Sequence, residues 1–267
     1  MKFYFTLFFT IIISISSYAI NPVRDYIGTP SDYGICYTEK FIDVDNYTLC
    51  IWESTPEKQL HEKTIVLVYG DYGNMSYYMR YIQFYVNLGY RFISFDYRGF
   101  GKSSDLEIEI KDKMLYYEEF IYDLDNILSY SANNLQAKDI TIISLSMGTV
   151  ITALSNKKEY ICSIIAEGAV YNSEDLIFRL GEKEVELPIN PKNTVEGWNN
   201  IESNILVFAG EQDNITTVND ATLIINQDVE NRTLIPYEAG HLAILNSVEG
   251  ERLYYDTVKK FLKNECR

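Results

Sequence analysis

The chain has 267 residues, of which 47% are hydrophobic and 23% are charged. This is an ordinary globular composition, which excludes an intrinsically disordered chain and a collagen-like or low-complexity polymer. Acidic residues outnumber basic ones by 38 to 23, for a formal net charge of -15. Such a field repels phosphate backbones, so we expect no nucleic-acid partner. With only two histidines, His61 and His241, a zinc site built from several histidines is also excluded.

The amino terminus has the order of a secretory signal: a positively charged start, an apolar stretch from Phe3 to about Ile15, and small residues ending at Ala19. The apolar stretch is shorter than the roughly 20 residues that a transmembrane helix needs. The sequence therefore predicts a signal peptide over residues 1–19 and one domain over residues 20–267. We expect an exported protein, periplasmic or secreted, without a stable membrane span after cleavage. An anchor formed by an uncleaved signal is the less favoured alternative.

Export makes the four cysteines candidates for disulfides, and the sequence does not choose among the three possible pairings of Cys36, Cys50, Cys162 and Cys266. None of them forms a Cys-x-x-Cys pair, so a metal site is not expected. Cys162 begins an apolar run and fits a buried free thiol equally well.

Short β-branched apolar runs alternate with longer amphipathic stretches, which is the pattern of a mostly parallel sheet with helical crossovers. Strands are predicted at Phe41–Val44, Leu49–Glu53, Ile65–Tyr69, Arg91–Phe95, Ile140–Ser144, Ile161–Ala166, Ile205–Ala209 and Arg232–Pro236. We expect the first two to form a hairpin across Asp45 and Asn46.

Helices are expected between these strands. The clearest is Tyr116–Tyr130, where apolar residues recur at spacings of three and four. Others are predicted at Ser76–Leu88, Met147–Asn156, Asn219–Asn226 and Val248–Lys263. Residues 171–203 have weak periodicity and two prolines, and we expect them to form a short lid inserted between strands.

The segment Ile140–Thr149 predicts a strand that runs into a sharp turn and then a helix, with Ser146 at the apex. Small residues at Ser144 and Gly148 leave room for the strained backbone, although Ser144 stands where the Gly-x-Ser-x-Gly pattern has its first glycine. The N–H of Met147, at the helix start, can stabilise an oxyanion. These features together predict a nucleophilic serine.

A second turn carries a family resemblance. Asp96–Ser103 reads Asp-Tyr-Arg-Gly-Phe-Gly-Lys-Ser and looks like the turn after the fourth strand of the α/β-hydrolase superfamily. The resemblance implies a mostly parallel eight-stranded sheet with helices on both faces and a short lid insertion. It also implies a structural role for the turn, with Arg98 paired to a carboxylate beneath the site.

The segment Tyr69–Ser76 is similar to the His-Gly-Asn-x-Gly-Asn stretch of the serine-aminopeptidase-like and protein-depalmitoylase-like branch, with Tyr69 in place of the histidine. The resemblance implies that the second oxyanion donor is the N–H of Asp71, or that of Tyr72. Only the backbone is required for this role, so we expect the Asp71 side chain to point away from the site.

Two further turns supply an acid and a base. Gly210-Glu211-Gln212-Asp213 follows a buried strand and resembles the acid turn of the superfamily, which makes Asp213 the predicted triad acid. Glu211, in the same turn, and Glu167, after the preceding strand, are the alternatives. The segment Pro236–His241 resembles the turn that carries the catalytic histidine.

The chain order Ser146, Asp213, His241 is that of α/β hydrolases. His61 precedes the strand Ile65–Tyr69 and is expected on the surface, at the opposite end from the site. Asn-x-Ser/Thr sequons occur at Asn46, Asn74, Asn214 and Asn231. A glycan on either of the two that fall in site turns would obstruct the pocket, which favours a bacterial exported protein.

In the predicted mechanism, His241 takes the proton of Ser146 while Asp213 orients the imidazole, which requires no metal or cofactor. Serine at the turn argues against the aspartyl-ester chemistry of haloalkane dehalogenases and epoxide hydrolases. The sequence therefore predicts a secreted serine hydrolase, like a carboxylesterase, lipase or thioesterase, that acts on a small-molecule or acylated substrate.

Two alternatives stay open. One is an aminopeptidase or amidase of the same fold, for which Glu182, Glu184 and Glu186 in the lid are candidate carboxylates toward a substrate amine. The other is a catalytically inactive hydrolase fold that binds a ligand or partner. The acyl preference and the oligomeric state do not follow from the sequence.

Overall fold

The computed structural model describes residues 20–109, 111, 113–181, 185–188 and 190–263. The predicted signal peptide lies outside these ranges. Within them, no helix combines the length and the apolar character that crossing a membrane requires.

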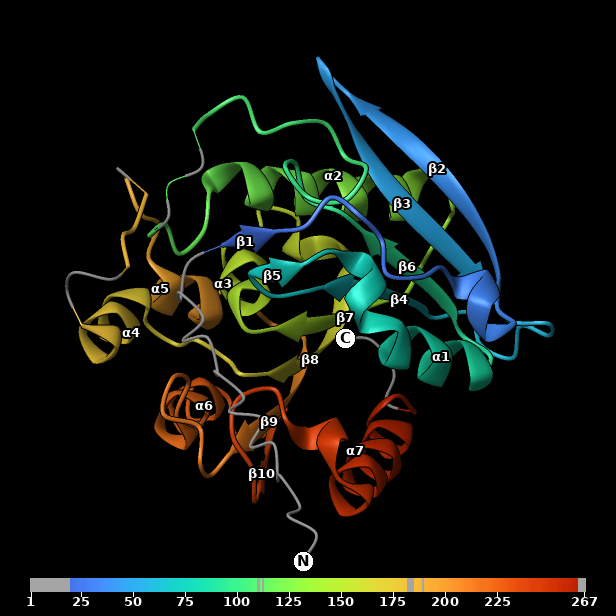
Figure 1. Cartoon of the computed structure of the whole chain (residues 1–267). Coiled ribbons are helices and arrows are strands. Elements are labelled where there is room, and N and C mark those ends of the chain that lie inside the picture. Colours follow the sequence, from blue (N-terminus) through green and yellow to red (C-terminus); the bar gives the residue numbers. More distant parts are fainter. Residues whose placement is uncertain (1–19, 110, 112, 182–184, 189, 264–267) are drawn as a thin grey trace, which may run out of the picture.

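A mixed eight-stranded sheet forms the centre of the molecule (Figure 1). Its order is β10-β9-β8-β7-β4-β6-β3-β2, and the pairs from β10 to β6 are parallel, whereas β6–β3 and β3–β2 are antiparallel. The strands are β2 Cys36–Val44, β3 Tyr47–Thr55, β4 Thr64–Val68, β6 Arg91–Phe95, β7 Ile140–Leu145, β8 Ile161–Glu167, β9 Asn204–Gly210 and β10 Arg232–Tyr237. The predicted fold class and all eight predicted strands are thus confirmed.

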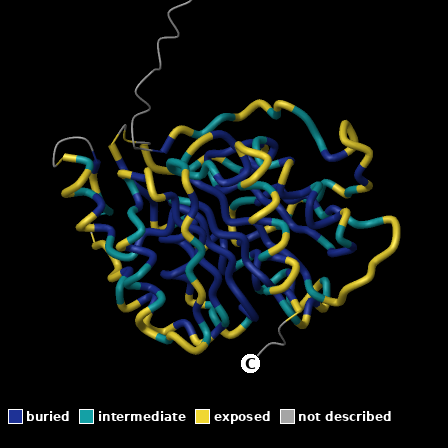
Figure 2. The backbone as a smooth tube through the Cα atoms, turned by 90° about the horizontal axis from the view of Figure 1, so that it is seen from below, coloured by how far each residue is buried: buried dark blue, intermediate teal, exposed yellow. Residues whose placement is uncertain are grey.

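Helices cover both faces of the sheet (Figure 1). Helices α1 and α7 pack together on one face, where the rings of Phe84 and Tyr255 stack 4.1 Å apart, and α2 and α3 lie on the other. Figure 2 shows the buried residues gathered in the strands between these layers. The helices are α1 Met79–Asn87, α2 Glu118–Asn133, α3 Met147–Leu154, α4 Ser173–Leu180, α5 Thr194–Asn199, α6 Val218–Ile225 and α7 Val248–Phe261. Short 3-10 helices are η1 Pro30–Tyr33, η2 Met75–Tyr78, η3 Lys158–Tyr160 and η4 Ile244–Asn246.

The parallel strands at the centre are buried along their length, as β4, β7 and β8 show. This burial explains why their sequences are apolar runs without alternation. The edge strand β2 differs, because it begins at Cys36, five residues before the predicted start. Most of β2 is exposed or half-buried, so its first half has no apolar pattern from which to predict it.

A second, two-stranded sheet was not predicted. Strand β1 (Asn21–Pro22) pairs in parallel with β5 (Tyr72–Gly73). The pairing brings the first described residues against the loop that follows β4, far along the chain.

Residues 171–203, the predicted lid, contain α4 and α5. The indole of Trp198 in α5 is fully buried and donates to the carbonyl of Val170 at 2.8 Å. The Arg232 guanidinium donates to the carbonyls of Trp198 and Ile201. These contacts fix the second half of the segment to the body of the domain, whereas α4 exposes Phe178.

Two of the four cysteines are free, so the chain does not form two disulfides. Cys36 and Cys50 are free, and their register partners, Thr55 and Phe41, place them five residue steps apart on β2 and β3. Five steps of a strand span about 17 Å, which a disulfide does not bridge. Cys162 is disulfide-bonded, so its interpretation as a free thiol is wrong. Cys266 lies outside the described residues.

A buried ion pair holds the turn after β6. As the resemblance implied, Arg98 pairs with a carboxylate, that of Asp123 on α2: Nε lies 2.8 Å from Oδ1, and the Arg98 N–H donates to Oδ2 at 2.9 Å. The guanidinium also covers the ring of Tyr47. Burial raises the pKa of Asp123 to about 6, against the opposing effect of Arg98.

We expect Arg98→Met to lower the free energy of unfolding by about 3–5 kcal/mol at pH 7.5, because it leaves a buried carboxylate without its cation. The loss should shrink as the pH falls toward 5. Protonation of Asp123 neutralises the carboxyl in the folded variant, so the folded state binds more protons than the unfolded state and gains stability. Urea unfolding at both pH values measures the effect.

Arg252→Met is the matched control, since Arg252 pairs with Asp256 on the surface at 3.8 Å. It should change stability by less than about 1 kcal/mol. Equal losses for the two variants would contradict the role assigned to Asp123.

Candidate active site

The turn between β7 and α3 presents Ser146 in a strained backbone conformation. Its φ is +50° and its ψ is -119°, in a region that a residue with a side chain rarely adopts. The Ser146 N–H donates to the carbonyl of Glu167 at 3.0 Å. A Cβ at Gly148 would collide with the carbonyl of Val68, so a glycine is required where the helix passes β4.

Ser144, which replaces a glycine, is accommodated by a partner. The side chain is fully buried, and its hydroxyl lies 2.8 Å from that of Thr152 on α3. A buried hydroxyl with a hydrogen bond carries little desolvation penalty.

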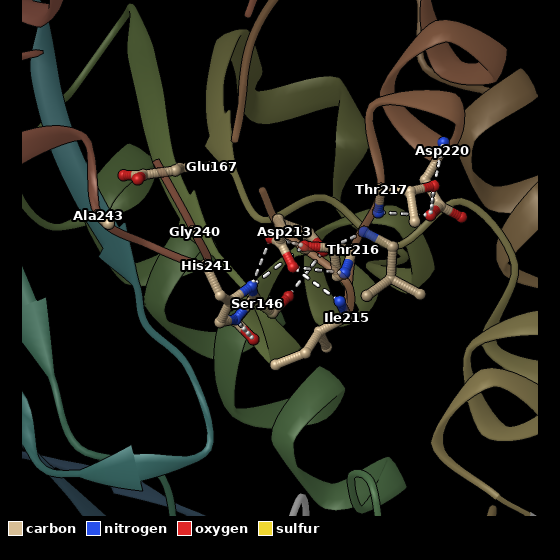
Figure 3. A network of polar contacts seen from close by, with 12 residues as sticks. Ser146, Glu167, Asp213, Ile215, Thr216, Thr217, Asp220, Gly240, His241 and Ala243 are labelled. Carbon is tan, nitrogen blue, oxygen red and sulfur yellow. Dashed lines mark hydrogen bonds and ion pairs between the residues drawn. The ribbon is translucent and has the colours of Figure 1, made fainter. Parts of the chain in front are cut away.

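The structure brings Ser146, His241 and Asp213 together from three loops (Figure 3). His241 Nε2 lies 2.9 Å from Ser146 Oγ, and Nδ1 lies 2.8 Å from Asp213 Oδ2. An ionised carboxylate only accepts hydrogen bonds, so the Nδ1 proton points to Asp213 and Nε2 is free to accept the serine proton.

Asp213 is held as an anion. Burial alone would raise its pKa, but hydrogen bonds from His241 and Thr216 and the charge of His241 lower it below the ordinary value. Its Oδ1 accepts the N–H groups of Ile215 and Thr216, and the Thr216 hydroxyl donates to Oδ2 at 2.7 Å. These local bonds fix the carboxylate in the orientation that the imidazole needs.

The alternatives for the acid lie elsewhere. Glu211 is exposed, and Glu167 is buried with hydrogen-bond partners other than His241. His61 is exposed and stacks on Tyr90 with ring centroids 4.1 Å apart, as expected for a surface residue.

The loop after β4 lies beside the nucleophile. A Cβ at Gly70 would be 3.4 Å from the Cβ of Ser146, so the loop passes the serine just before it reaches Asp71 and Tyr72. Met147 begins α3, and its N–H belongs to the first helical turn, whose N–H groups have no acceptor within the helix. The three predicted oxyanion donors therefore belong to the two segments next to Ser146, the loop after β4 and the start of α3.

Asp71 is half-buried, which differs from the expectation that its side chain points away. Burial raises the pKa of its carboxyl, and the charge of His241 opposes this effect. The carboxyl is thus easier to protonate than one in water.

Tyr69 has a hydrogen-bond partner although it replaces the family histidine. Its hydroxyl donates to Oδ1 of the buried Asp96 at 3.2 Å, and the Tyr97 hydroxyl donates to the Tyr69 carbonyl at 3.0 Å. Asp96 also accepts the N–H of Met75 and the hydroxyl of Tyr26. One carboxylate therefore supports the loop from behind.

Residues 20–28, which we call the strap, hold the same loop from outside. The Asn21 N–H donates to the carbonyl of Asp71 at 2.7 Å. The buried Asn74 amide donates to the carbonyls of Val23 and Asp25, at 3.0 and 2.9 Å, and its oxygen accepts the Ser76 N–H. The sequon asparagine at position 74 is thus enclosed in the folded protein.

Sequence reasoning missed three contributors to this site: the strap, Thr216 and Tyr78. The Tyr78 hydroxyl lies 3.7 Å from a Cβ placed on Gly70 and donates to the carbonyl of Tyr72 at 3.4 Å. A threonine three residues after the acid was the available signal for Thr216, because such turns bond to their own backbone. The strap has no comparable signal, since its pairing partner is remote in sequence.

The predicted amine-binding carboxylates have little part in the described site. Glu182 and Glu184 lie outside the described residues. Glu186 is exposed, with a carboxylate oxygen 3.9 Å from Lys111 Nζ.

We expect Asn74→Ala to lower the free energy of unfolding by about 2–3 kcal/mol, because it removes the bonds of a buried amide to the Val23 and Asp25 carbonyls and leaves the Ser76 N–H without its acceptor. Hydrogen exchange should quicken in residues 20–28 and 70–76 relative to the rest of the chain. Asn46→Ala is the control, since Asn46 is exposed and its amide bonds to Glu107 at the surface; it should stay within about 0.5 kcal/mol of the wild type. Unchanged exchange in the strap would contradict this role.

Known proteins that resemble this chain are hydrolases. Residues 59–182 match a family model described as serine aminopeptidase, S33. Among curated proteins no sequence matches.

Solved structures share the fold at low sequence identity. The Pyrococcus furiosus esterase Pf2001 has a TM-score of 0.76 and 21% identity, over 93% of this chain and 99% of the esterase. A predicted hydrolase from Thermoplasma acidophilum has a TM-score of 0.61 and 18% identity, over 85% and 100%. The Pyrococcus horikoshii acylaminoacyl peptidase has a TM-score of 0.66 and 16% identity, over 87% of this chain and 42% of the peptidase. By its sheet, its turns and these similarities, the chain is an α/β hydrolase in fold, with the serine-aminopeptidase sequence pattern over residues 59–182.

Proposed function

We propose that this protein is a serine hydrolase that cleaves an ester or thioester through an acyl-enzyme intermediate. The observation that carries the proposal is the pair of short contacts, 2.9 Å from Ser146 Oγ to His241 Nε2 and 2.8 Å from Nδ1 to Asp213. A serine hydroxyl is a weak nucleophile until a base takes its proton, and this arrangement supplies the base and its orienting acid.

In the first half-reaction, Ser146 Oγ attacks the substrate carbonyl carbon while Nε2 accepts the Oγ proton. The carbonyl oxygen becomes an oxyanion, for which the N–H groups of Met147 and Asp71 are the proposed donors, with that of Tyr72 as the alternative to Asp71. The intermediate collapses as the imidazolium gives its proton to the leaving alcohol or thiol. The acyl group stays on Ser146.

In the second half-reaction, Nε2 takes a proton from water, and the resulting hydroxide attacks the acyl carbon. Collapse of this intermediate breaks the bond to Oγ, which regains its proton from the imidazolium. The products are a carboxylic acid and the free enzyme, so the chain needs no other reactant than water.

An aminopeptidase or amidase is the second candidate. The family model carries the serine-aminopeptidase description, and acylaminoacyl peptidases are among the structural neighbours. An amide leaving group demands full protonation by the imidazolium, whereas a thiolate does not, so leaving-group dependence separates the two candidates.

We also propose that the protein is exported, with residues 1–19 as its signal peptide, and that residues 171–203 act as a short lid over the acyl site. The order of residues at the amino terminus supports the first proposal. The exposed α4 with Phe178 at its surface supports the second.

We expect Ser146→Ala to abolish labelling by a fluorophosphonate probe and to lower ester turnover by about a million-fold, as removal of a triad serine does in subtilisin. The protein should be residues 20–267, and the labelled peptide should contain residue 146. Ser129→Ala is the control, because Ser129 is half-buried on α2 and bonds only to a helix carbonyl; it should label like the wild type.

A folded wild-type protein that does not label would overturn the enzyme proposal and favour the binding-protein alternative. Where labelling occurs, matched p-nitrophenyl esters, thioesters and aminoacyl p-nitroanilides decide between the candidates. Anilide turnover equal to ester turnover would favour the peptidase.

A further inference from the structure

Glu167 ends β8 directly beneath the site, yet the triad does not use it. Its side chain is 1% exposed. Charged side chains are rarely buried to this extent unless hydrogen bonds compensate them. The partners of this carboxylate therefore indicate what it does.

Three donors converge on the two carboxylate oxygens. Oε1 accepts the Tyr237 hydroxyl at 2.8 Å and the Ile244 N–H at 3.1 Å. Oε2 accepts the Tyr81 hydroxyl, from α1, at 3.0 Å. Two of the three donors flank the loop that carries His241, one on each side of it.

The Tyr237 hydroxyl extends this contact along the loop. It lies 3.1 Å from the carbonyl of Gly240, the residue before His241, and accepts the Ala243 N–H at 3.3 Å. Figure 3 shows Glu167 beside this loop, with Gly240 between it and His241. One carboxylate thus fixes both ends of a short segment whose middle is the predicted base.

The backbone of the same residues fixes the nucleophile. The carbonyl of Glu167 accepts the Ser146 N–H at 3.0 Å. At Gly168, whose φ is +64°, a Cβ would lie 2.7 Å from His241 Cε1. Residues 167 and 168 therefore pass next to the imidazole and contact both Ser146 and His241, whose Oγ and Nε2 lie 2.9 Å apart.

We propose that Glu167 is a positioning residue that holds the His241 loop in register with Ser146. The carboxylate acts through the loop and not on the substrate. The kinetic test of this inference rests on the proposed function. The spectroscopic test does not require that the protein is an enzyme.

The test variant is Glu167→Gln, which keeps the length of the side chain but replaces one acceptor oxygen with a donor, so that at least one of the three donors loses its acceptor. Asp125→Asn is the matched control. Asp125 is also buried and accepts three donors, the Ser155 hydroxyl and the N–H and amide of Asn156. Those donors lie away from the His241 loop.

The spectroscopic test uses the histidine content, since His241 and His61 are the only histidines. In protein labelled with 15N-histidine, a hydrogen-bonded Nδ1–H of His241 gives a downfield proton resonance, and His61 serves as the internal reference. Glu167→Gln should weaken or abolish that resonance and leave His61 unchanged. Asp125→Asn should leave both as in the wild type.

The kinetic test counts active sites with the fluorophosphonate probe. Turnover is then expressed per labelled site, so unfolded protein does not lower the measured kcat. Glu167→Gln should lower kcat about 10- to 100-fold with KM within about twofold, the effect of a small misplacement of a catalytic group. Tyr237→Phe, which keeps the carboxylate, should show a smaller loss in the same direction. Asp125→Asn should keep the wild-type kcat.

The proposal is overturned if Glu167→Gln keeps the wild-type His241 resonance, or if its kcat per labelled site equals that of Asp125→Asn. A wild type that neither labels nor turns over an ester refutes the proposed function alone. The His241 resonance then still decides whether Glu167 positions the loop.

Discussion

The site depends on one strained residue, because Ser146 must stand above the sheet at a φ of +50° while its side chain stays in reach of a base. Three constraints hold it there. The Ser146 N–H donates to the Glu167 carbonyl, and the preceding strand β7 is fully buried. Gly148 has no side chain, which lets α3 pass the carbonyl of Val68. Each constraint comes from a different strand, so the sheet must be assembled before the turn is stable. The strain is stored at the residue whose hydroxyl lies 2.9 Å from His241 Nε2.

The remaining polar groups of the site are arranged around buried carboxylates. Asp96 supports the loop that carries Asp71, Asp123 holds the following turn through Arg98, and Glu167 holds the His241 loop. A buried charge tolerates few arrangements of its donors, so each loop is fixed in one conformation. The departures from the family pattern fit this scheme, since Tyr69 reaches Asp96 and Ser144 finds Thr152.

The sequence predicted the central strands and the site turns, because each has a pattern within a short stretch of residues. Central strands are buried on both faces and therefore read as apolar runs, and the turns at Ser146, Asp213 and His241 carry small residues. Gly148 and Gly210 leave no space for a Cβ. Contacts between distant segments have no such signal. The pairing of β1 with β5 involves two residues on each side, and the partners of Glu167 come from α1, β10 and η4, so they follow only from the assembled sheet. The half-burial of Asp71 likewise depends on how the loop packs and does not follow from the amino-acid sequence of the loop.

The strap joins the chemistry of the site to the end of the described chain. Ile20 is 5% exposed, and its N–H donates to the carbonyl of Met114 at 3.3 Å. The next residue already bonds to the loop that carries Asp71. A protease that trims even a few residues beyond this point would remove the bonds that the strap makes to that loop, while the bonds to Asp96 and the strands of the eight-stranded sheet would remain. Retention of residues 20–25 and the conformation of the loop that carries Asp71 are therefore coupled in this structure.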